Sequence, residues 1–352
     1  MTFSRPHRRT AARALSAPLL ALAALAAYGT DARAEEQVNI YSYREPGLID
    51  PILKEFTKET GIKANVVFSK DGLIERMTAE GRNSPADVLL VNESGLLFKA
   101  KEAGVTQPLE SKVIEEKVGA QLRDPERHWF AVTQRARVVY ASKERVKQDV
   151  ISYEELADPK WKGKICTRSG QHTYNIALIA SIIAHDGEEK AEAWLTGLRD
   201  NLARKPAGGD REGVRDVQAG LCDLAIGNTY YMVAMLKNPE QKAWADSVKI
   251  LFPNAADRGT HVNISGAALA ANAPHKDNAA KLLEFLVSHN AQELYAEQTG
   301  EYPVVADAHA SDLVKSWGEL KADPIALSKL AELRKKASEL VDKVRFDAGP
   351  SS

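Results

Sequence analysis

Short β-prone runs and helical stripes alternate along the chain after residue 37. Three runs are predicted to be strands: Val38–Tyr41, Ile62–Phe68 and Asp87–Val91. The last is continuously apolar, as a strand buried in a parallel sheet is. Apolar residues at helical spacing between them predict two helices: Leu48–Thr60, which Gly61 ends, and Gly72–Glu80. This order predicts a mostly parallel sheet with helices on both faces.

The same alternation restarts after residue 163. Its predicted strands are Ile165–Thr167, Cys222–Ile226, Val248–Phe252 and Ile264–Ala270. Its predicted helices are Tyr174–His185, Glu188–Arg199, Gly209–Ala219, Asn278–Ser288, Ala291–Gln298 and Leu327–Val341. Strand-like passages at Trp129–Tyr140 and Thr260–Ala270 connect the two α/β units. We therefore predict two lobes joined at a hinge, with a ligand cleft where strands end and helices begin.

The first 34 residues differ in composition from the rest. Four arginines between residues 5 and 13 precede an apolar run from Ala14 to Ala27, and Ala32–Ala34 follows the small-x-small cleavage rule. The run is shorter than the roughly 20 residues that a membrane span needs. We predict an exported protein whose signal peptide is cleaved after Ala34, by either the Sec or the Tat route.

Charge and length further restrict the class of protein that this chain can be. The leader carries a net charge of +4 and the whole chain −1, which leaves −5 for the 318 mature residues. A mildly acidic, charge-mixed chain is not typical of a nucleic-acid-binding protein. No other stretch is long and apolar enough to enter a membrane, and the mature length favours two lobes over one simple core.

Two cysteines, Cys166 and Cys222, occur in the mature chain, each in a strand-like run before a polar loop. In an oxidising compartment they can form a disulfide; the alternative is two buried free thiols. The spacing is not a zinc pattern. We favour the bridge.

Three loops combine polar residues with a preceding strand: Tyr41–Pro46, Arg168–Asn175 and Ile226–Tyr231. Glycine-containing loops that open helices present free backbone N–H groups at a positive helix end, which favours anions. Thr229 is a plausible helix N-cap, which would place Tyr230 and Tyr231 in the first turn.

Two adjacent tyrosines at a helix start can converge on one ion, whereas on a strand they would face opposite sides. Tyrosine hydroxyls normally stay protonated, but a bound trivalent cation favours the phenolate, a hard anionic ligand suited to ferric iron. Most tyrosines are packing residues, so this spacing alone leaves both readings open.

The chain resembles bacterial ferric-ion-binding proteins, the iron-importing branch of the periplasmic solute-binding superfamily. The most specific stretches are Tyr41–Arg44, Ser84–Val88, Arg135–Val138, Arg168–Asn175, Gly227–Tyr231 and Asn263–Gly266. The resemblance implies an α/β, two-lobed, type II periplasmic binding-protein fold with a cleft at the hinge. It also implies Fe³⁺ capture by Tyr174, Tyr230 and Tyr231.

In similar proteins an anion, often carbonate, completes the iron shell. The resemblance implies that Arg44 and Arg135 hold it, with backbone N–H groups near Ser169 and Gly170. Arginine forks suit a planar oxyanion. Glu45 stands where many relatives carry histidine, so it is either an extra oxygen ligand or a solvated residue. His172, near Tyr174, is either a ligand or an exposed loop residue.

The predicted lobes are residues 35–132 plus about 263–310, and about 137–260 plus 311–349, with crossings near 129–140 and 258–270. The predicted protein is a periplasmic monomer, not an enzyme, that delivers iron to an inner-membrane ABC permease and its ATPase. One alternative is the same fold binding an organic cation or an oxyanion without metal. A weaker one is a periplasmic hydrolase, but the sequence has no G-x-S-x-G elbow or H-E-x-x-H helix.

Overall fold

The computed structural model describes residues 36–350. The predicted signal peptide and its cleavage site after Ala34 lie outside these residues. None of the helices in the described part is long and apolar enough to cross a membrane.

The elements alternate as the sequence pattern predicts. The strands are β1 (Gln37–Ser42), β2 (Lys63–Phe68), β3 (Val88–Val91), β4 (Thr106–Gln107), β5 (Phe130–Ser142), β6 (Ile165–Cys166), β7 (Leu224–Asn228), β8 (Val248–Leu251) and β9 (Val262–Ala270). The first helices are α1 (Pro46–Thr60), α2 (Leu73–Glu80), α3 (Ser94–Glu102), α4 (Lys112–Lys117), α5 (Thr173–Asp186), α6 (Glu188–Asp200) and α7 (Asp210–Gln218). The remaining helices are α8 (Tyr230–Lys237), α9 (Lys242–Asp246), α10 (Lys276–Leu286), α11 (His289–Thr299), α12 (Asp312–Lys315) and α13 (Leu327–Lys343).

Helix α1 illustrates why the pattern is informative. Its apolar residues Ile49, Ile52, Leu53 and Phe56 are all buried on one face. Gly61 ends the helix with φ 73°, a left-handed conformation that suits glycine at this position.

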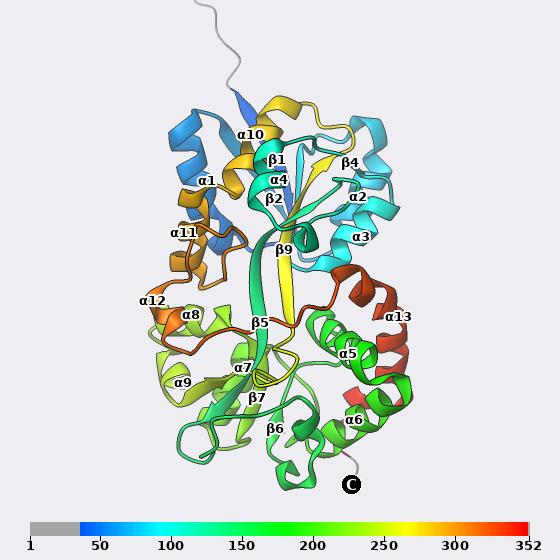
Figure 1. The fold of residues 1–352 in the computed structure, drawn as a ribbon, viewed down its shortest axis with the longest axis vertical. Helices are drawn as coiled ribbons and strands as arrows, with labels where there is room; N and C mark the ends of the chain where they lie inside the picture. The colour runs from blue at the N-terminus through cyan, green and yellow to red at the C-terminus, as the bar shows by residue number, and fades with distance from the viewer. Residues whose placement is uncertain (1–35, 351–352) are drawn as a thin grey trace, which may run out of the picture. The chain divides into compact units, whose positions relative to one another are not determined.

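Two groups of strands meet at β5 (Figure 1). In the first group, β1 pairs in parallel with β2 and β3, while β9 pairs antiparallel with β3, β4 and the first half of β5. In the second group, the far half of β5 pairs antiparallel with β7 and β8, and β6 pairs in parallel with β7. Strands β5 and β9 therefore form the two predicted passages between the units.

The pairing corrects one detail of the prediction. The sheets are mixed, not mostly parallel, because the two long connecting strands pair antiparallel with their neighbours. Runs such as Val88–Val91 are buried throughout, but burial does not reveal the direction of the neighbouring strand. The predicted lobe boundaries stay a prediction, since the described residues form one compact unit.

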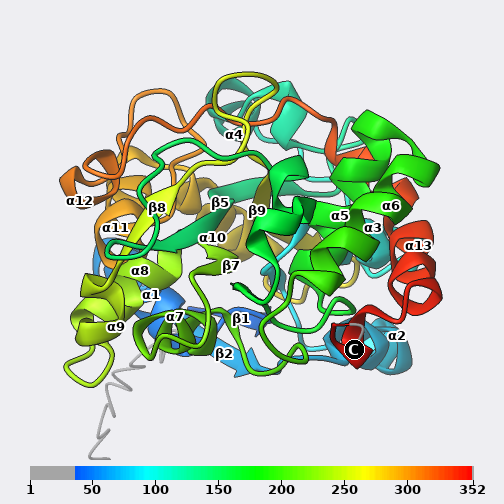
Figure 2. The same cartoon turned by 90° about the horizontal axis from the view of Figure 1, so that it is seen from below.

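Helices cover the strands in two groups. Figure 2 shows α5, α6 and α13 on one side of β5 and β9, and α8, α9, α11 and α12 on the other. Helix α13 packs against both α5 and α3, so it contacts the two halves of the fold.

The predicted disulfide is confirmed. Cys166 and Cys222 are bonded, with their Cα atoms 5.9 Å apart. The bridge joins the end of β6 to the segment before β7, and the helices that follow these strands, α5 and α8, carry the tyrosines predicted as ligands.

Candidate binding site

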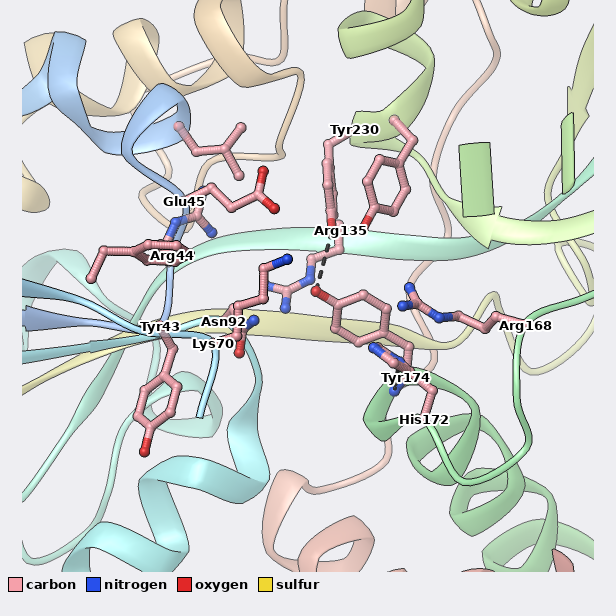
Figure 3. Close-up of a pocket in the computed structure, with 13 residues that line it drawn as sticks. Tyr43, Arg44, Glu45, Lys70, Asn92, Arg135, Arg168, His172, Tyr174 and Tyr230 are labelled. Atoms are coloured by element: carbon pink, nitrogen blue, oxygen red, sulfur yellow. Dashed lines mark hydrogen bonds between the residues drawn. The ribbon is translucent and has the colours of Figure 1, made fainter. Parts of the chain in front are cut away.

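A cavity of about 220 Å³ lies where several strands end (Figure 3). Its lining residues are Tyr43, Arg44, Glu45, Leu48, Phe68, Lys70, Asn92, Arg135, Arg168, His172, Tyr174, Tyr230 and Tyr231. They come from the loops after β1, β2, β3 and β6, from strands β2 and β5, and from the first turns of α1, α5 and α8. This is the position at strand ends and helix starts where α/β folds bind ligands.

The three tyrosines predicted as ligands line the same cavity. Tyr174 is the second residue of α5, and Tyr230 and Tyr231 are the first two of α8. The hydroxyls of Tyr174 and Tyr230 are 3.2 Å apart and point toward each other (Figure 3). The rings of Tyr230 and Tyr231 are 4.3 Å apart between centroids. The starts of two separate helices therefore bring three phenols together.

Burial changes the acidity of this pair. The pKa of Tyr230 is raised well above its usual value by burial and by the neighbouring phenols of Tyr174 and Tyr231. Burial also raises the pKa of Tyr231, assisted by Tyr174 and Asp210. Without a cation nearby, both phenols stay protonated at neutral pH.

Two arginines face the phenols with free donors. Arg135 is 1% exposed, and its Nε and Nη2 atoms have no hydrogen-bond partner among the described residues. The Nε of Arg168 likewise has none in the described part of the chain. The Cζ atoms of Arg135 and Arg168 lie 5.8 and 5.4 Å from the centre of the Tyr174 ring. Free guanidinium donors in a buried site favour an oxyanion.

Arg44 lines the cavity, but most of its donors are committed. Its Nη1 and Nη2 donate to the Glu301 carboxylate at 3.0 and 2.5 Å, and Nη1 also donates to Ser265. Burial alone would lower the pKa of Arg44, but Glu301 outweighs it and the pKa is raised. Burial would raise the pKa of Glu301, but Arg44 lowers it. The pair is therefore ionised, and Arg44 keeps Nε and one N–H of Nη2 for a ligand.

Ser169 and Gly170, which are predicted to help hold the anion, have a different partner in this structure. Neither lines the cavity. The Ser169 hydroxyl and the Gly170 N–H both donate to the Asp347 carboxylate, at 2.5 and 2.7 Å. The loop does bind an anion, but that anion is a side chain of the same protein.

His172 and Glu45, the two uncertain ligands, both line the cavity. His172 caps α5, since its Nδ1 accepts the N–H of Tyr174 at 3.2 Å. Burial and the nearby Arg168 lower the pKa of His172 to about 3, so its imidazole is neutral. Glu45 is exposed and precedes α1 without capping it through its side chain.

Thr229 occupies the predicted N-cap position of α8, with Tyr230 and Tyr231 in the first turn. Thr229 precedes α8, but its side chain makes no capping bond there. Its hydroxyl instead accepts the N–H of Ala136 at 3.3 Å. The first-turn position of Tyr230 and Tyr231 does not depend on that cap.

Residues 36–350 contain no group of three or more His, Cys, Asp or Glu side chains arranged to hold a metal ion.

Sequence reasoning missed Arg168 and Glu301 as site residues. Arg168 stands in the same loop as Tyr174, directly after a strand, which was a usable signal. Glu301 lies 257 residues after Arg44 in the sequence, and no local pattern distinguishes it from a surface carboxylate.

Comparison with known proteins identifies the family. A family model described as bacterial extracellular solute-binding protein matches residues 83–321, more than half of the chain. The chain belongs to this family.

Relatives in the family cover nearly the whole chain. Iron uptake protein A1 of Synechocystis sp. is 43% identical over 312 residues, which are 88% of this chain and 87% of that protein. Apo ferric ion-binding protein A of Pasteurella haemolytica is 48% identical, with a TM-score of 0.85, covering 89% of this chain and 98% of that one. The Trichodesmium protein IdiA (FutA), solved with iron and citrate ligands, is 42% identical, with a TM-score of 0.83, covering 88% and 99%.

These relatives confirm the resemblance and the predicted two-lobed, type II fold class. The family is one of solute-binding transport proteins, not of enzymes.

Proposed function

We propose that the chain captures ferric iron in this cavity through the phenolate oxygens of Tyr174, Tyr230 and Tyr231. The observation that carries the proposal is the convergence of these phenols, with the Tyr174 and Tyr230 hydroxyls 3.2 Å apart. At this distance the neutral phenols of Tyr174 and Tyr230 form one hydrogen bond with each other. Three phenolates so close would repel one another unless a trivalent cation lay between them.

The charges around the phenols support an accompanying anion. Six charged side chains form two ion-pair groups beside them: Arg44, Arg135 and Glu301, and Arg137, Arg168 and Asp210. Four cations and two carboxylates leave a net charge of +2, and Lys70 and Glu45 in the lining offset each other. Three phenolates balance Fe³⁺, so a dianion such as carbonate would balance the rest.

Arg135 and Arg168 are the residues we assign to that anion, because they carry the unpartnered N–H groups noted above. This changes the expectation for Arg44, whose fork binds Glu301. Arg44 then acts mainly on the position of Arg135, which shares Ser265 with it. The citrate in the Trichodesmium structure makes a carboxylate ligand the alternative to carbonate.

The family supports a role outside the cytoplasm. We place the mature chain, cleaved after Ala34, in the periplasm as a monomer that is not inserted in the membrane. Its two lobes, with the predicted boundaries, would close on iron, and an ABC permease with its ATPase would receive it. Glu45 and His172 are not needed as ligands in this proposal.

The test compares tyrosine variants loaded with ferric citrate in bicarbonate. Tyr174→Phe and Tyr230→Phe should each weaken iron binding by more than the about 10–100-fold typical of losing an outer-shell partner. Tyr302→Phe is the control, since its buried hydroxyl has no partner within residues 36–350. Competition with a chelator measures the affinity. Equal affinities in all three variants would contradict the proposal.

A second candidate is an oxyanion carrier that needs no metal. The unpartnered Nε and Nη2 of Arg135 favour it. Iron-free protein that binds carbonate or citrate as tightly as loaded protein would support this candidate over the first.

A further inference from the structure

Arg137 lies on β5 next to the tyrosine-bearing segments without lining the cavity. It is 2% exposed, and its Cζ atom lies 5.8 Å from the centre of the Tyr174 ring. Its Nη2 donates to Asn175 Oδ1 at 2.7 Å, and its Nη1 donates to Asn228 Oδ1 at 3.0 Å. Asn175 directly follows Tyr174, and Asn228 is the last residue of β7, just before Thr229 and Tyr230. One guanidinium group therefore joins both segments.

The guanidinium group is itself fixed in place. Asp210, the first residue of α7, accepts from Nη1 at 2.5 Å and from Nη2 at 3.4 Å. Burial would raise the pKa of Asp210, but Arg137 and Arg168 lower it, so the carboxylate is ionised. Asp210 also accepts the backbone N–H of Asn228 at 3.1 Å. The Arg137 backbone is held as well, because Arg137 faces Asn228 across the β5–β7 pairing.

Asn175 passes this restraint to the loop before α5. Its Nδ2 donates to the carbonyls of Arg168 and Ser169, both at 3.1 Å. The start of α5, the Arg168 loop and the end of β7 thus share one network centred on a single planar cation. A flat guanidinium with donors in a fixed fork can bind two amide oxygens and a carboxylate together, whereas a lysine ammonium is a flexible point charge.

We propose that Arg137 is a positioning residue of the proposed iron site, setting the distance between the Tyr174 and Tyr230 hydroxyls. The inference rests on the proposed function. Metal and catalytic sites need their donors held within about 0.5 Å of the productive geometry. Arg137 touches neither hydroxyl, but it binds the residue after Tyr174 and the residue two before Tyr230.

The chain offers a matched control. Arg145 also bridges separate segments, since its Nη2 donates to the Val217 carbonyl in α7 at 2.6 Å and its Nε donates to Asp223, before β7, at 2.6 Å. It does not line the cavity. The variants are Arg137→Lys, Arg137→Gln and Arg145→Lys. In both Arg137 variants Asp210 keeps its ion pair with Arg168, so the residue assigned to the anion is unchanged.

Each variant is loaded with ferric citrate in bicarbonate. Its visible phenolate–iron band, its iron affinity in chelator competition and its melting temperature are measured. We expect both Arg137 variants to bind iron about 10–100-fold more weakly and to shift the band, because the phenolate oxygens no longer meet at the same distance. Arg145→Lys should keep the wild-type band and affinity.

Two results would overturn the positioning role of Arg137, and a third would overturn the proposed function. Arg137 variants with the wild-type band and affinity would overturn the positioning role. So would an affinity loss that matches the loss of stability while the band stays unchanged, since that is what a structural residue produces. A wild-type protein without any iron band would instead overturn the proposed function itself.

Discussion

The Cys166–Cys222 bridge gives a stability prediction whose size follows from the structure. The two cysteines are 56 residues apart in sequence. In the chain-entropy account, closing such a loop costs the unfolded chain about 14 cal/mol/K, or about 4 kcal/mol at 25 °C. Unfolding entropy of about 2.1 cal/mol/K per residue over residues 36–350 converts this to a fall in Tm of about 6 °C.

The perturbation is Cys166→Ser/Cys222→Ser, assayed by calorimetry of iron-free protein with and without a reductant. Reductant should lower the wild-type Tm to a value slightly above that of the double variant, and it should leave the Tm of the variant unchanged. Both cysteines are buried, so the serine hydroxyls add a further cost. A double variant as stable as the oxidised wild type would refute the reasoning that the bridge stabilises the fold by restricting the unfolded chain.

Three further predictions concern charge and protons. Iron affinity should rise with pH between 6 and 8, and each bound iron should release at least two protons, because the pKa values of Tyr230 and Tyr231 are raised and iron binds the ionised phenols. A pH-stat titration counts the released protons. A titration in which none is released would contradict coordination by phenolates. Glu301→Gln should lower the free energy of unfolding by about 3–5 kcal/mol, because it leaves Arg44 buried without its partner; denaturant unfolding measures it, and Arg44→Met/Glu301→Gln should recover most of the loss. Burial and the nearby arginines lower the pKa of His261 to about 3, so below pH 6.5 the unfolded chain binds a proton that the folded chain does not bind. The free energy of unfolding should therefore fall as the pH drops from about 6.5 toward 3. His261→Gln should reduce this pH dependence, and an unchanged slope would exclude His261 as its cause.

Much of the fold could be predicted because helix and strand signals in this chain are local. The apolar stripe of α1 and its terminal Gly61 placed that helix to within two residues at its start. The direction of strand pairing was not local. Strand β9 forms its sheet with partners far away in sequence, and its burial is the same whichever way a neighbour runs.

The site residues also divide into those with a local sequence signal and those without one. The tyrosines were identifiable because they follow strands and open helices, a position that the sequence displays. The partners of the arginines and loops were not, since Glu301 and Asp347 come from distant segments. Asp347 accepts hydrogen bonds from Ser169 and Gly170. From the sequence alone, these donors looked like a binding site for an external anion.

The most direct test of the proposed function is a visible absorption titration of the mature protein with ferric citrate in bicarbonate. Phenolate coordination predicts a broad charge-transfer band that saturates at one iron per protein and disappears in Tyr230→Phe/Tyr231→Phe. Tight iron binding without that band, or a band that persists in the double variant, would contradict iron capture by these tyrosines.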